Sequence, residues 1–370
     1  MKILYFGEYS GLHTLLAQGM KELGHEVTTV GNGNMFHDFP RDIDIKRGDG
    51  RLSGLMHYWR LMRLLPRFRN YDIVQLINPE CFGLKAEREY AFYRYLRRHN
   101  RKMVAGAFGC DWYWVDDGLR HKTFRYGDFY IGDEMRTDAA AREFIDDYDG
   151  TVKGEYTRFV MEDADWIPTC IYEYQACYSR YFPHKTQFIP LPMDASNDTP
   201  VHEFDGHRVR FFIGIDKARS QYKGTDIMLE ALEDVVRRFP DRCEMVKVES
   251  LPFAEYEVSM NGCDVMLDQL YSYTPSMNSL LAMSKGIIVV GGGEPENYEI
   301  LHEDKLRPII NVEPTRKSVC QQLEWIVRHP EMINQLKADS IAYVKKHHDY
   351  RNVARQYAKM YERLLEDSDS

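Results

Sequence analysis

Residues 276–296 read SMNSLLAMSKGIIVVGGGEPE and combine the signals of a helix, a strand and a loop. Ser276 is a good helix N-cap, and Gly286 can end the helix in the left-handed conformation. The apolar run 287–290 is typical of a buried strand, and the three glycines after it relax the backbone. The stretch therefore predicts a helix, a strand and a loop of the size that holds a phosphate.

The same alternation continues on both sides of this stretch. Helical patterns, such as residues 12–23 and 225–239, separate the apolar runs, and helices follow from Arg316 onward. This order predicts parallel strands joined by helical crossovers. The strands are expected at residues 2–6, 26–30, 72–77, 103–108, 209–214, 243–248, 264–269, 287–290 and 308–312.

The alternation predicts an α/β protein with two Rossmann-like, doubly wound domains facing a crevice. The chain has 370 residues, of which 44% are hydrophobic, and this is enough for two cores. The polar stretch 195–206 reads as a linker. We expect an N-terminal domain at 1–195 and a C-terminal domain at 206–349, with the crevice between them as the default site.

Composition excludes several classes of protein. The formal charge of −9 argues against a broad basic surface for nucleic acid. No G-x-G-x-x-G or G-x-x-x-x-G-K-[ST] motif occurs, which disfavours nicotinamide and ATP enzymes. The first apolar run is too short for a signal peptide and no stretch reaches membrane-spanning length, so we expect a cytoplasmic protein.

Metal ligation is not expected. The seven cysteines form no C-x-x-C pair. Two Asp-x-Asp pairs, at 42–44 and 163–165, have the ligand type that divalent cations prefer. Such pairs are common on solvated surfaces, so no metal site is assigned to them.

A cationic loop follows the strand expected at 209–214. It carries Lys217, Arg219 and Lys223 and leads into the helix from Thr225. Open α/β sheets bind ligands at the carboxyl ends of their strands, where a diphosphate would find these cations and the helix amides together. The alternative is a solvated charged loop.

The helix after Ser276 offers a second anion site. The first amides of a helix have no partner within it, so those of Met277, Asn278 and Ser279 are expected to face a donor phosphate. The alternative is a simple capped helix.

Five short motifs occur in order along the chain: Gly24-His25-Glu26-Val27, Lys223-Gly224, Asp264-Val265-Met266-Leu267, Ala282-Met283-Ser284-Lys285-Gly286 and Gly292-Gly293-Glu294-Pro295-Glu296. This ordered set resembles the GT-B retaining glycosyltransferases of family 4, also called glycosyltransferase group 1. The resemblance covers nearly the whole chain and is closest between Phe211 and Glu299. It implies a nucleotide-sugar donor held by the C-terminal domain, an acceptor facing the N-terminal domain, no metal and no cofactor. It also implies that a final helix, 350–370, crosses back onto the first domain.

The chain departs from this family at its two hallmark glutamates. Aligned on Ala282-Met283, those positions hold Tyr273 and Leu281, which leaves the donor, or activity itself, open. The glycine loop is also shorter, which brings Glu294 and Glu296 closer to the crevice. We predict that these two acids replace the missing pair at the donor sugar; the alternative is a surface turn whose acids are solvated or complement a helix dipole.

Further site residues are expected around the same crevice. Gly11, in the turn that follows the first strand, and Tyr273 are assigned to the donor. Asp111 follows the strand at 103–108, roughly where the family places a His-Asp or Ser-Asp element near the donor sugar. It either accepts a hydroxyl of the sugar or acceptor, or caps a turn.

The stretch 51–69 carries an amphipathic helix pattern. One stripe is apolar, and Arg60, Arg63 and Arg67 line another. The apolar stripe is either a core face with a solvated back, or part of a surface for anionic membrane or a lipid-diphosphate acceptor. Its members are Leu52, Leu55, Met56, Trp59, Met62 and Leu65.

Together these patterns predict a retaining, metal-independent hexosyltransferase. It would transfer a sugar from a nucleotide-diphosphate donor to a glycan or lipid-linked glycan, in polysaccharide biosynthesis, either in the cytoplasm or peripheral on the inner membrane face. The alternatives are a non-catalytic sugar-nucleotide-binding subunit, because the glutamate pair is missing, and a GT-B nucleotide-sugar epimerase. Activity that survives EDTA is expected of the main prediction.

Overall fold

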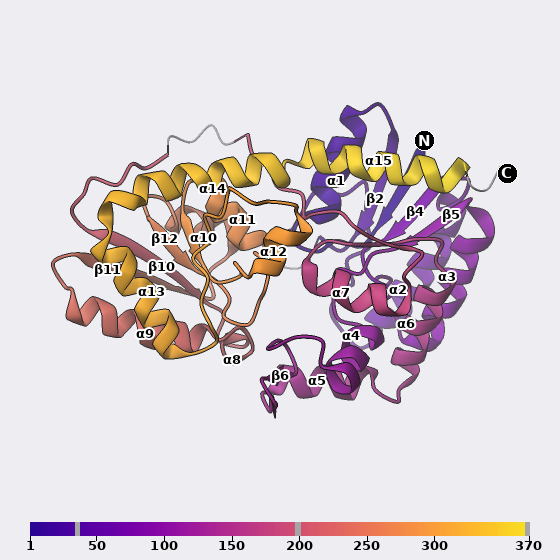
Figure 1. The fold of residues 1–370 in the computed structure, drawn as a ribbon. Coiled ribbons are helices and arrows are strands. Elements are labelled where there is room, and N and C mark those ends of the chain that lie inside the picture. Colours follow the sequence, from indigo (N-terminus) through magenta and orange to yellow (C-terminus); the bar gives the residue numbers. More distant parts are fainter. Residues whose placement is uncertain (34–37, 197–200, 367–370) are drawn as a thin grey trace. The chain divides into compact units, whose positions relative to one another are not determined.

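The computed structural model describes residues 1–33, 38–196 and 201–366 (Figure 1). The chain divides into two compact units. Unit 1 contains Met1–Thr123, Glu143–Pro192 and Tyr350–Ser370, and unit 2 contains Phe124–Arg142 and Met193–Asp349. The segment 124–142, which the sequence patterns left inside the N-terminal domain, thus packs with the C-terminal half. Part of the expected linker, residues 197–200, lies outside the described residues.

Unit 1 is built on a five-stranded parallel sheet in the order β3-β2-β1-β4-β5. A short parallel pair, β8 and β9, extends it through bridges beside β5. The strands are β1 (Lys2–Phe6), β2 (Glu26–Gly31), β3 (Ile43–Asp44), β4 (Ile73–Leu76), β5 (Lys102–Ala105), β8 (Ile167–Thr169) and β9 (Thr186–Phe188). The helices are α1 (Leu12–Glu22), α2 (Ser53–Leu64), α3 (Ala86–His99), α4 (Trp112–Asp116), α6 (Val152–Asp163), α7 (Tyr172–Tyr181) and α15 (Tyr350–Glu366).

The C-terminal helix α15 completes the core of unit 1. It lies along α1, as Figure 1 shows, and a Cβ added at Gly19 of α1 would come within 2.5 Å of the Ala354 side chain. The Tyr361 hydroxyl donates a hydrogen bond of 2.7 Å to the buried Gln75 of β4. The last described helix of the chain therefore packs on the first.

Unit 2 is built on a four-stranded parallel sheet in the order β11-β10-β12-β13. Its strands are β10 (Val209–Ile215), β11 (Cys243–Glu249), β12 (Val265–Leu267) and β13 (Ile288–Val290). The hairpin β6 (Tyr130–Ile131) and β7 (Glu134–Met135) also belongs to it, and α5 (Ala139–Tyr148) contains the boundary at Arg142. The helices are α8 (Ser220–Lys223), α9 (Thr225–Arg238), α10 (Phe253–Ser259), α11 (Met277–Ser284), α12 (Pro295–Ile300), α13 (Arg316–Arg328) and α14 (Ile333–His347).

The core of unit 2 follows the predicted pattern. Phe211 and Ile213 of β10 are fully buried against Leu232 of α9. Each large apolar side chain buried in this way contributes about 1.5–3 kcal/mol. The amphipathic face of α9 is therefore held on the sheet by packing, as a crossover helix requires.

The sequence predicted the existence of the strands more accurately than the residues at which they begin and end. The first eight strands expected from the apolar runs are all present and run parallel. The strand expected at 308–312 is wrong, because only Ile310 forms an isolated bridge, to Val290. The helix at 276–286 is confirmed, with Ser276 accepting from the Ser279 amide and Gly286 at φ +73°.

The core-face interpretation of the apolar stripe at 52–65 is wrong. The residues of α2 that face inward are Ser53, His57 and Leu61, whereas Leu65 is the only member of the stripe that is buried. The stripe has the right period for a helix, but periodicity alone does not say which face meets the core. The five exposed members are Leu52, Leu55, Met56, Trp59 and Met62.

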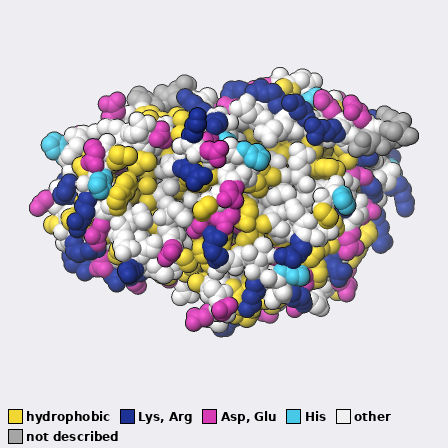
Figure 2. All heavy atoms as spheres, viewed as in Figure 1, with side chains coloured by type: hydrophobic (Ala, Val, Ile, Leu, Met, Phe, Trp, Pro, Cys, Tyr) yellow, Lys and Arg dark blue, Asp and Glu magenta, His cyan; other side chains and the backbone are white. Residues whose placement is uncertain are grey.

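The surface carries both signs of charge. On the face drawn in Figure 2, Lys and Arg side chains are interspersed with Asp and Glu. No helix in the described part of the chain is long and apolar enough to cross a membrane.

A buried ion pair in unit 2 gives a test of this packing. Lys337 of α14 lies 2.9 Å from Asp264, and the two side chains are 3% and 1% exposed. Lys337→Met removes the buried cation and should lower the free energy of unfolding by about 3–5 kcal/mol, measured by urea denaturation. Lys345→Met, at an exposed site on the same helix, is the control and should change it by less than about 0.5 kcal/mol. Equal effects of the two variants would contradict the assigned pair.

Candidate functional site

Three loops of unit 2 meet at one edge of its sheet. They follow β10, β12 and β13, which are neighbours in the sheet. Because the strands are parallel, their carboxyl ends lie at the same edge, which is where such sheets bind ligands. The loops are residues 216–219, 268–276 and 291–294.

Asp268, directly after β12, organises the start of α11. Its carboxylate is nearly buried and accepts hydrogen bonds from the hydroxyls of Ser276 and Ser279, the second at 2.6 Å. The Asn278 amide group lies 3.3 Å from the same carboxylate and donates to the Tyr256 hydroxyl at 2.7 Å. These side chains fix the N-terminus of α11 against the edge of the sheet.

The predicted amide site at α11 is smaller than expected. The Ser276 hydroxyl accepts the Ser279 N–H at 3.2 Å, so this amide is capped within the protein. No hydrogen-bond partner in the described part of the chain accepts the backbone N–H of Met277 or Asn278. Two amides, at positions 277 and 278, therefore remain for an anion.

The glycine loop after β13 passes very close to the loop after β12. A Cβ at Gly291 would lie 2.2 Å from the Gln269 carbonyl oxygen, and one at Gly292 would lie 2.7 Å from that of Thr274. Both glycines also have positive φ, at +101° and +74°. Only glycine fits the close approach and the positive φ without a shift of the backbone. The two loops therefore pack against each other and form one continuous surface.

The three predicted cations differ in what they contact. Lys217 is paired with Glu249 at 2.7 Å, and this pairing lowers the pKa of Glu249. The Arg219 guanidinium lies 5.1 Å from the centre of the Tyr222 ring. Lys223 is half-buried at the end of α8, and its side chain forms no ion pair with any described residue. Its carbonyl oxygen accepts the Leu270 N–H at 2.9 Å, which joins this loop to the one after β12.

Glu294 and Glu296 meet at a residue that the sequence did not indicate. Arg125 donates to Glu294 at 2.8 Å and to the two oxygens of Glu296 at 2.5 and 3.3 Å. The Tyr126 hydroxyl also donates to Glu294. Burial acts to raise the pKa of Glu296, but the Arg125 hydrogen bond and charge lower it overall. Residues of the segment 124–142 thus orient both acids, and Arg125 keeps Glu296 ionised.

Tyr273 forms the platform under Arg125. Its ring centre lies 4.9 Å from the guanidinium carbon and 4.8 Å from the Tyr126 ring. Its hydroxyl accepts the Arg125 backbone N–H at 2.8 Å. Burial raises the pKa of Tyr273, so the phenol is neutral at physiological pH. Tyr273 therefore supports a cation.

The other end of the same segment is fixed by Arg136. This guanidinium is buried and donates to the carbonyls of Gln221 and Tyr222 in α8, at 3.0 and 2.9 Å. It is paired with Asp138 at 2.9 Å and lies 4.2 Å from the centre of the Tyr271 ring. The segment 124–142 therefore connects the cationic loop with the glycine loop, and we call it the strap.

The predicted residues of unit 1 occupy turns after its strands. Asp111 is fully buried and caps α4, where it accepts the amides of Tyr113 at 2.9 Å and Trp114 at 3.2 Å. Burial raises the pKa of Asp111 to about 6. Gly11 precedes α1 at φ +87°. Asp111 therefore acts as a cap, which is the alternative that the sequence left open, and its side chain has no exposed surface.

The three arginines assigned to the acceptor or a membrane lie in or directly after α2. The Arg60 guanidinium donates to the carbonyls of Asp44 and Lys46, the second at 3.3 Å. Arg63 and Arg67 are exposed and have no ion pair with any described residue.

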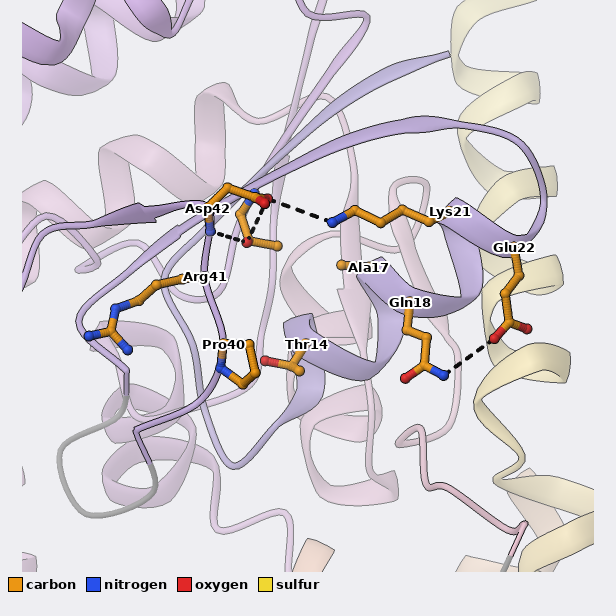
Figure 3. Close-up of a pocket in the computed structure, with 9 residues that line it drawn as sticks. Thr14, Ala17, Gln18, Lys21, Glu22, Pro40, Arg41 and Asp42 are labelled. Atoms are coloured by element: carbon orange, nitrogen blue, oxygen red, sulfur yellow. Dashed lines mark hydrogen bonds and ion pairs between the residues drawn. The ribbon is translucent and has the colours of Figure 1, made fainter.

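Unit 1 also contains a pocket that none of the predicted site residues lines. It has a volume of about 610 Å³ and lies between α1 and the segment before β3 (Figure 3). Lys21 points across it to Asp42 at 3.8 Å, and Asp42 accepts from the backbone and hydroxyl of Thr29. Its charges are thus paired within the protein. Over the described ranges of the chain, no group of three or more His, Cys, Asp or Glu side chains is placed to hold a metal ion.

Sequence reasoning found most of the edge of unit 2 but not the strap. Tyr273, Glu294 and Glu296 are brought together, and Lys223 adjoins the loop that leads to α11. Arg125, Tyr126 and Arg136 were missed. Their partners lie up to 171 residues away in the sequence, so no local pattern marks them.

No family model and no curated protein matches the sequence. Solved structures do match its fold. They include a sucrose-phosphate synthase from Thermosynechococcus elongatus (TM-score 0.62, 12% identity, 99% of this chain and 100% of that chain). Anabaena HepE in complex with UDP-glucose matches with a TM-score of 0.61, 11% identity, and coverage of 98% and 99%. WaaG, a glycosyltransferase involved in lipopolysaccharide biosynthesis, matches with a TM-score of 0.56, 11% identity, and coverage of 97% and 99%. The predicted fold class is confirmed: the chain has two Rossmann-like units and the GT-B fold.

The buried Asp111 predicts a pH dependence of stability. Its pKa is about 6 when folded, against about 3.9 when unfolded, so the folded state holds the proton more tightly. Its stabilising contribution is complete below pH 4 and is lost as the pH rises through 6, a change on the order of 2–3 kcal/mol. Asp111→Asn keeps an oxygen for the two capped amides and should remove this dependence. Unfolding free energies at pH 4.5 and 7 test it; the same pH slope in both proteins would contradict it.

The Arg125 cluster predicts energetic coupling between the strap and the glycine loop. Arg125→Ala and Glu296→Gln should each destabilise unit 2, and the double variant should lose less than the sum. We expect a coupling of about 0.5–1 kcal/mol, since Arg125 is 57% exposed and solvent screens the pair. Denaturation of the four proteins measures it. Arg142→Ala, which changes an exposed arginine of the same segment, is the control and should be additive with Glu296→Gln.

Proposed function

We propose that this protein transfers a sugar from a nucleotide-diphosphate donor to a hydroxyl of a glycan or lipid-linked glycan. The observation that carries the proposal is the edge of unit 2, where two amides of α11 and a close glycine loop lie together and the backbone of Lys223 joins the loop that leads to α11. Fixed cations and amides suit a diphosphate. The fold supports the same class, since WaaG is a glycosyltransferase and HepE holds UDP-glucose.

In this proposal the diphosphate is the leaving group. Negative charge grows on it as the glycosidic bond breaks, and Lys223, Arg219 and the amides at 277 and 278 stabilise that charge. Because fixed protein groups do this, the reaction needs no metal. The acceptor proton passes to the departing phosphate, which transfers the sugar with retention and requires no protein nucleophile.

The two glutamates contact the donor sugar in this proposal. Glu294 is nearly buried and Glu296 half-buried, and both are oriented by Arg125. A sugar that approaches the glycine loop therefore meets the carboxylates together with an exposed guanidinium. Hydrogen bonds of sugar hydroxyls to such a pair are directional, because neither acid is free to rotate.

A non-catalytic sugar-nucleotide-binding subunit is the second candidate. Arg125 already satisfies both acids, and Tyr273 and Leu281 stand at the hallmark positions. Donor bound without release of nucleoside diphosphate, with or without a glycan acceptor, would favour this candidate.

The test begins with a panel of nucleotide sugars and thermal shift, followed by the dissociation constant of the best ligand. Lys223→Ala should weaken its binding by about 10- to 100-fold, because a charge-assisted phosphate contact contributes about 1.5–3 kcal/mol. Lys317→Ala, at an exposed site on α13, is the matched control. If no nucleotide sugar binds, or if Lys223→Ala binds as tightly as the unchanged protein, the proposal fails.

A further inference from the structure

The outer face of α2 is an exposed apolar surface. Leu52, just before the helix, is 67% exposed, and Met56 and Trp59 are 69% and 57% exposed. Leu55 and Met62 are 50% and 37% exposed. Other exposed large apolar side chains of the described residues are scattered along the chain. Clustered exposure of this kind marks an interaction site more often than single residues do. We call these five residues the α2 apolar face.

The orientation of the helix is fixed by its other side. Ser53, His57 and Leu61 are buried, and the His57 ring shares a hydrogen bond of 2.8 Å with the Phe82 carbonyl. Side chains at i, i+4 and i+8 lie on one face of a helix. The apolar residues lie on the opposite face. They are therefore exposed although the helix is well packed on its inner side.

Cations border the α2 apolar face. Between residues 44 and 67 the chain has six Lys and Arg against two Asp, although the whole chain has a net charge of −9. Arg51, Arg63 and Arg67 are exposed and form no ion pair with any described residue, and Arg60 is held beside them by Asp44. Positive charge is therefore concentrated where the apolar side chains are exposed.

We propose that α2 binds the surface of an anionic lipid bilayer. An interfacial helix places its apolar face at the boundary between headgroups and acyl chains, while arginines at its edge contact lipid phosphates. Trp59 suits this boundary because its ring is apolar and its N–H is polar. The binding is independent of the transfer reaction. Where both hold, the acceptor is reached at a membrane.

A second copy of the chain fits this surface less well. A twofold interface brings the same patch of each copy together, so the patch that carries Arg60, Arg63 and Arg67 would meet the equally cationic patch of the other copy. Like charges across an interface are costly, whereas lipid phosphates compensate them. The charge pattern therefore favours lipid.

Sedimentation with vesicles tests the electrostatic part. The unchanged protein should bind vesicles that contain phosphatidylglycerol and bind pure phosphatidylcholine vesicles weakly. Reversal of Arg60, Arg63 and Arg67 to Glu should lower the partition coefficient at least about 100-fold, since each cation near the surface contributes about fivefold. The matched control reverses Arg98, Arg142 and Arg237, which are exposed outside α2, and should retain most binding. The proposal is wrong if the wild-type protein stays in the supernatant, or if both triple variants lose vesicle binding to the same extent.

A second variant tests the apolar part. Leu55→Ser, Met56→Ser and Trp59→Ser together should reduce vesicle binding at least about tenfold. They should lower the melting temperature by only a few degrees, because these side chains are already exposed and serine is only slightly less favourable in a helix. Sedimentation equilibrium without lipid tests the competing possibility, a dimer formed through the α2 apolar face. If the unchanged protein is a dimer that this variant dissociates, and it does not bind vesicles, the occupant is a second copy and the lipid proposal is wrong.

Discussion

The parallel pairing of β12 with β13 is the constraint on which the candidate site depends. The register sets Leu267 beside Val290, so the chain leaves both strands at the same edge. The two loops then approach so closely that Gly291 and Gly292 have no room for a side chain. The Glu294 N–H donates to the Tyr273 carbonyl at 3.2 Å, which sets the acid beside the aromatic platform. The backbone of the two loops therefore already sets the position of Glu294 beside Tyr273, independently of side-chain contacts.

The strap adds what the sheet cannot provide. Two arginines anchor it: Arg136 donates to the carbonyls at the end of α8, and Arg125 binds the acids after the glycines. Each guanidinium lies over a tyrosine, Tyr271 or Tyr273, from the loop after β12. Planar cations suit this role because they stack on a ring and donate at their edges at the same time. One short segment thus ties α8 to the loops after β12 and β13.

The sequence predicted the parts of this structure that repeat locally. Apolar runs and helical periods located the sheets of both units, and Ser276 and Gly286 marked the ends of α11 correctly. The sequence did not predict contacts between residues that lie far apart along the chain. The partners of Arg125 are 169 and 171 residues away, and nothing near Arg125 shows that it leaves one unit for the other. The α2 apolar face shows another limit: a helix period is the same whether the apolar stripe faces the core or the solvent.

The charges of the edge follow from these contacts. Lys217 is neutralised by Glu249, Arg136 by Asp138, and Arg125 by two carboxylates. Arg219, in the loop after β10, and Lys223, at the end of α8, have no carboxylate partner in the described part of the chain. With two amides of α11 they match a diphosphate in charge and in donor number. The Tyr273 position fits this pattern, because a glutamate there would place a third carboxylate beside Arg125 and leave the edge with excess negative charge. Tyr273 and the Arg125 cluster therefore belong to one electrostatic arrangement.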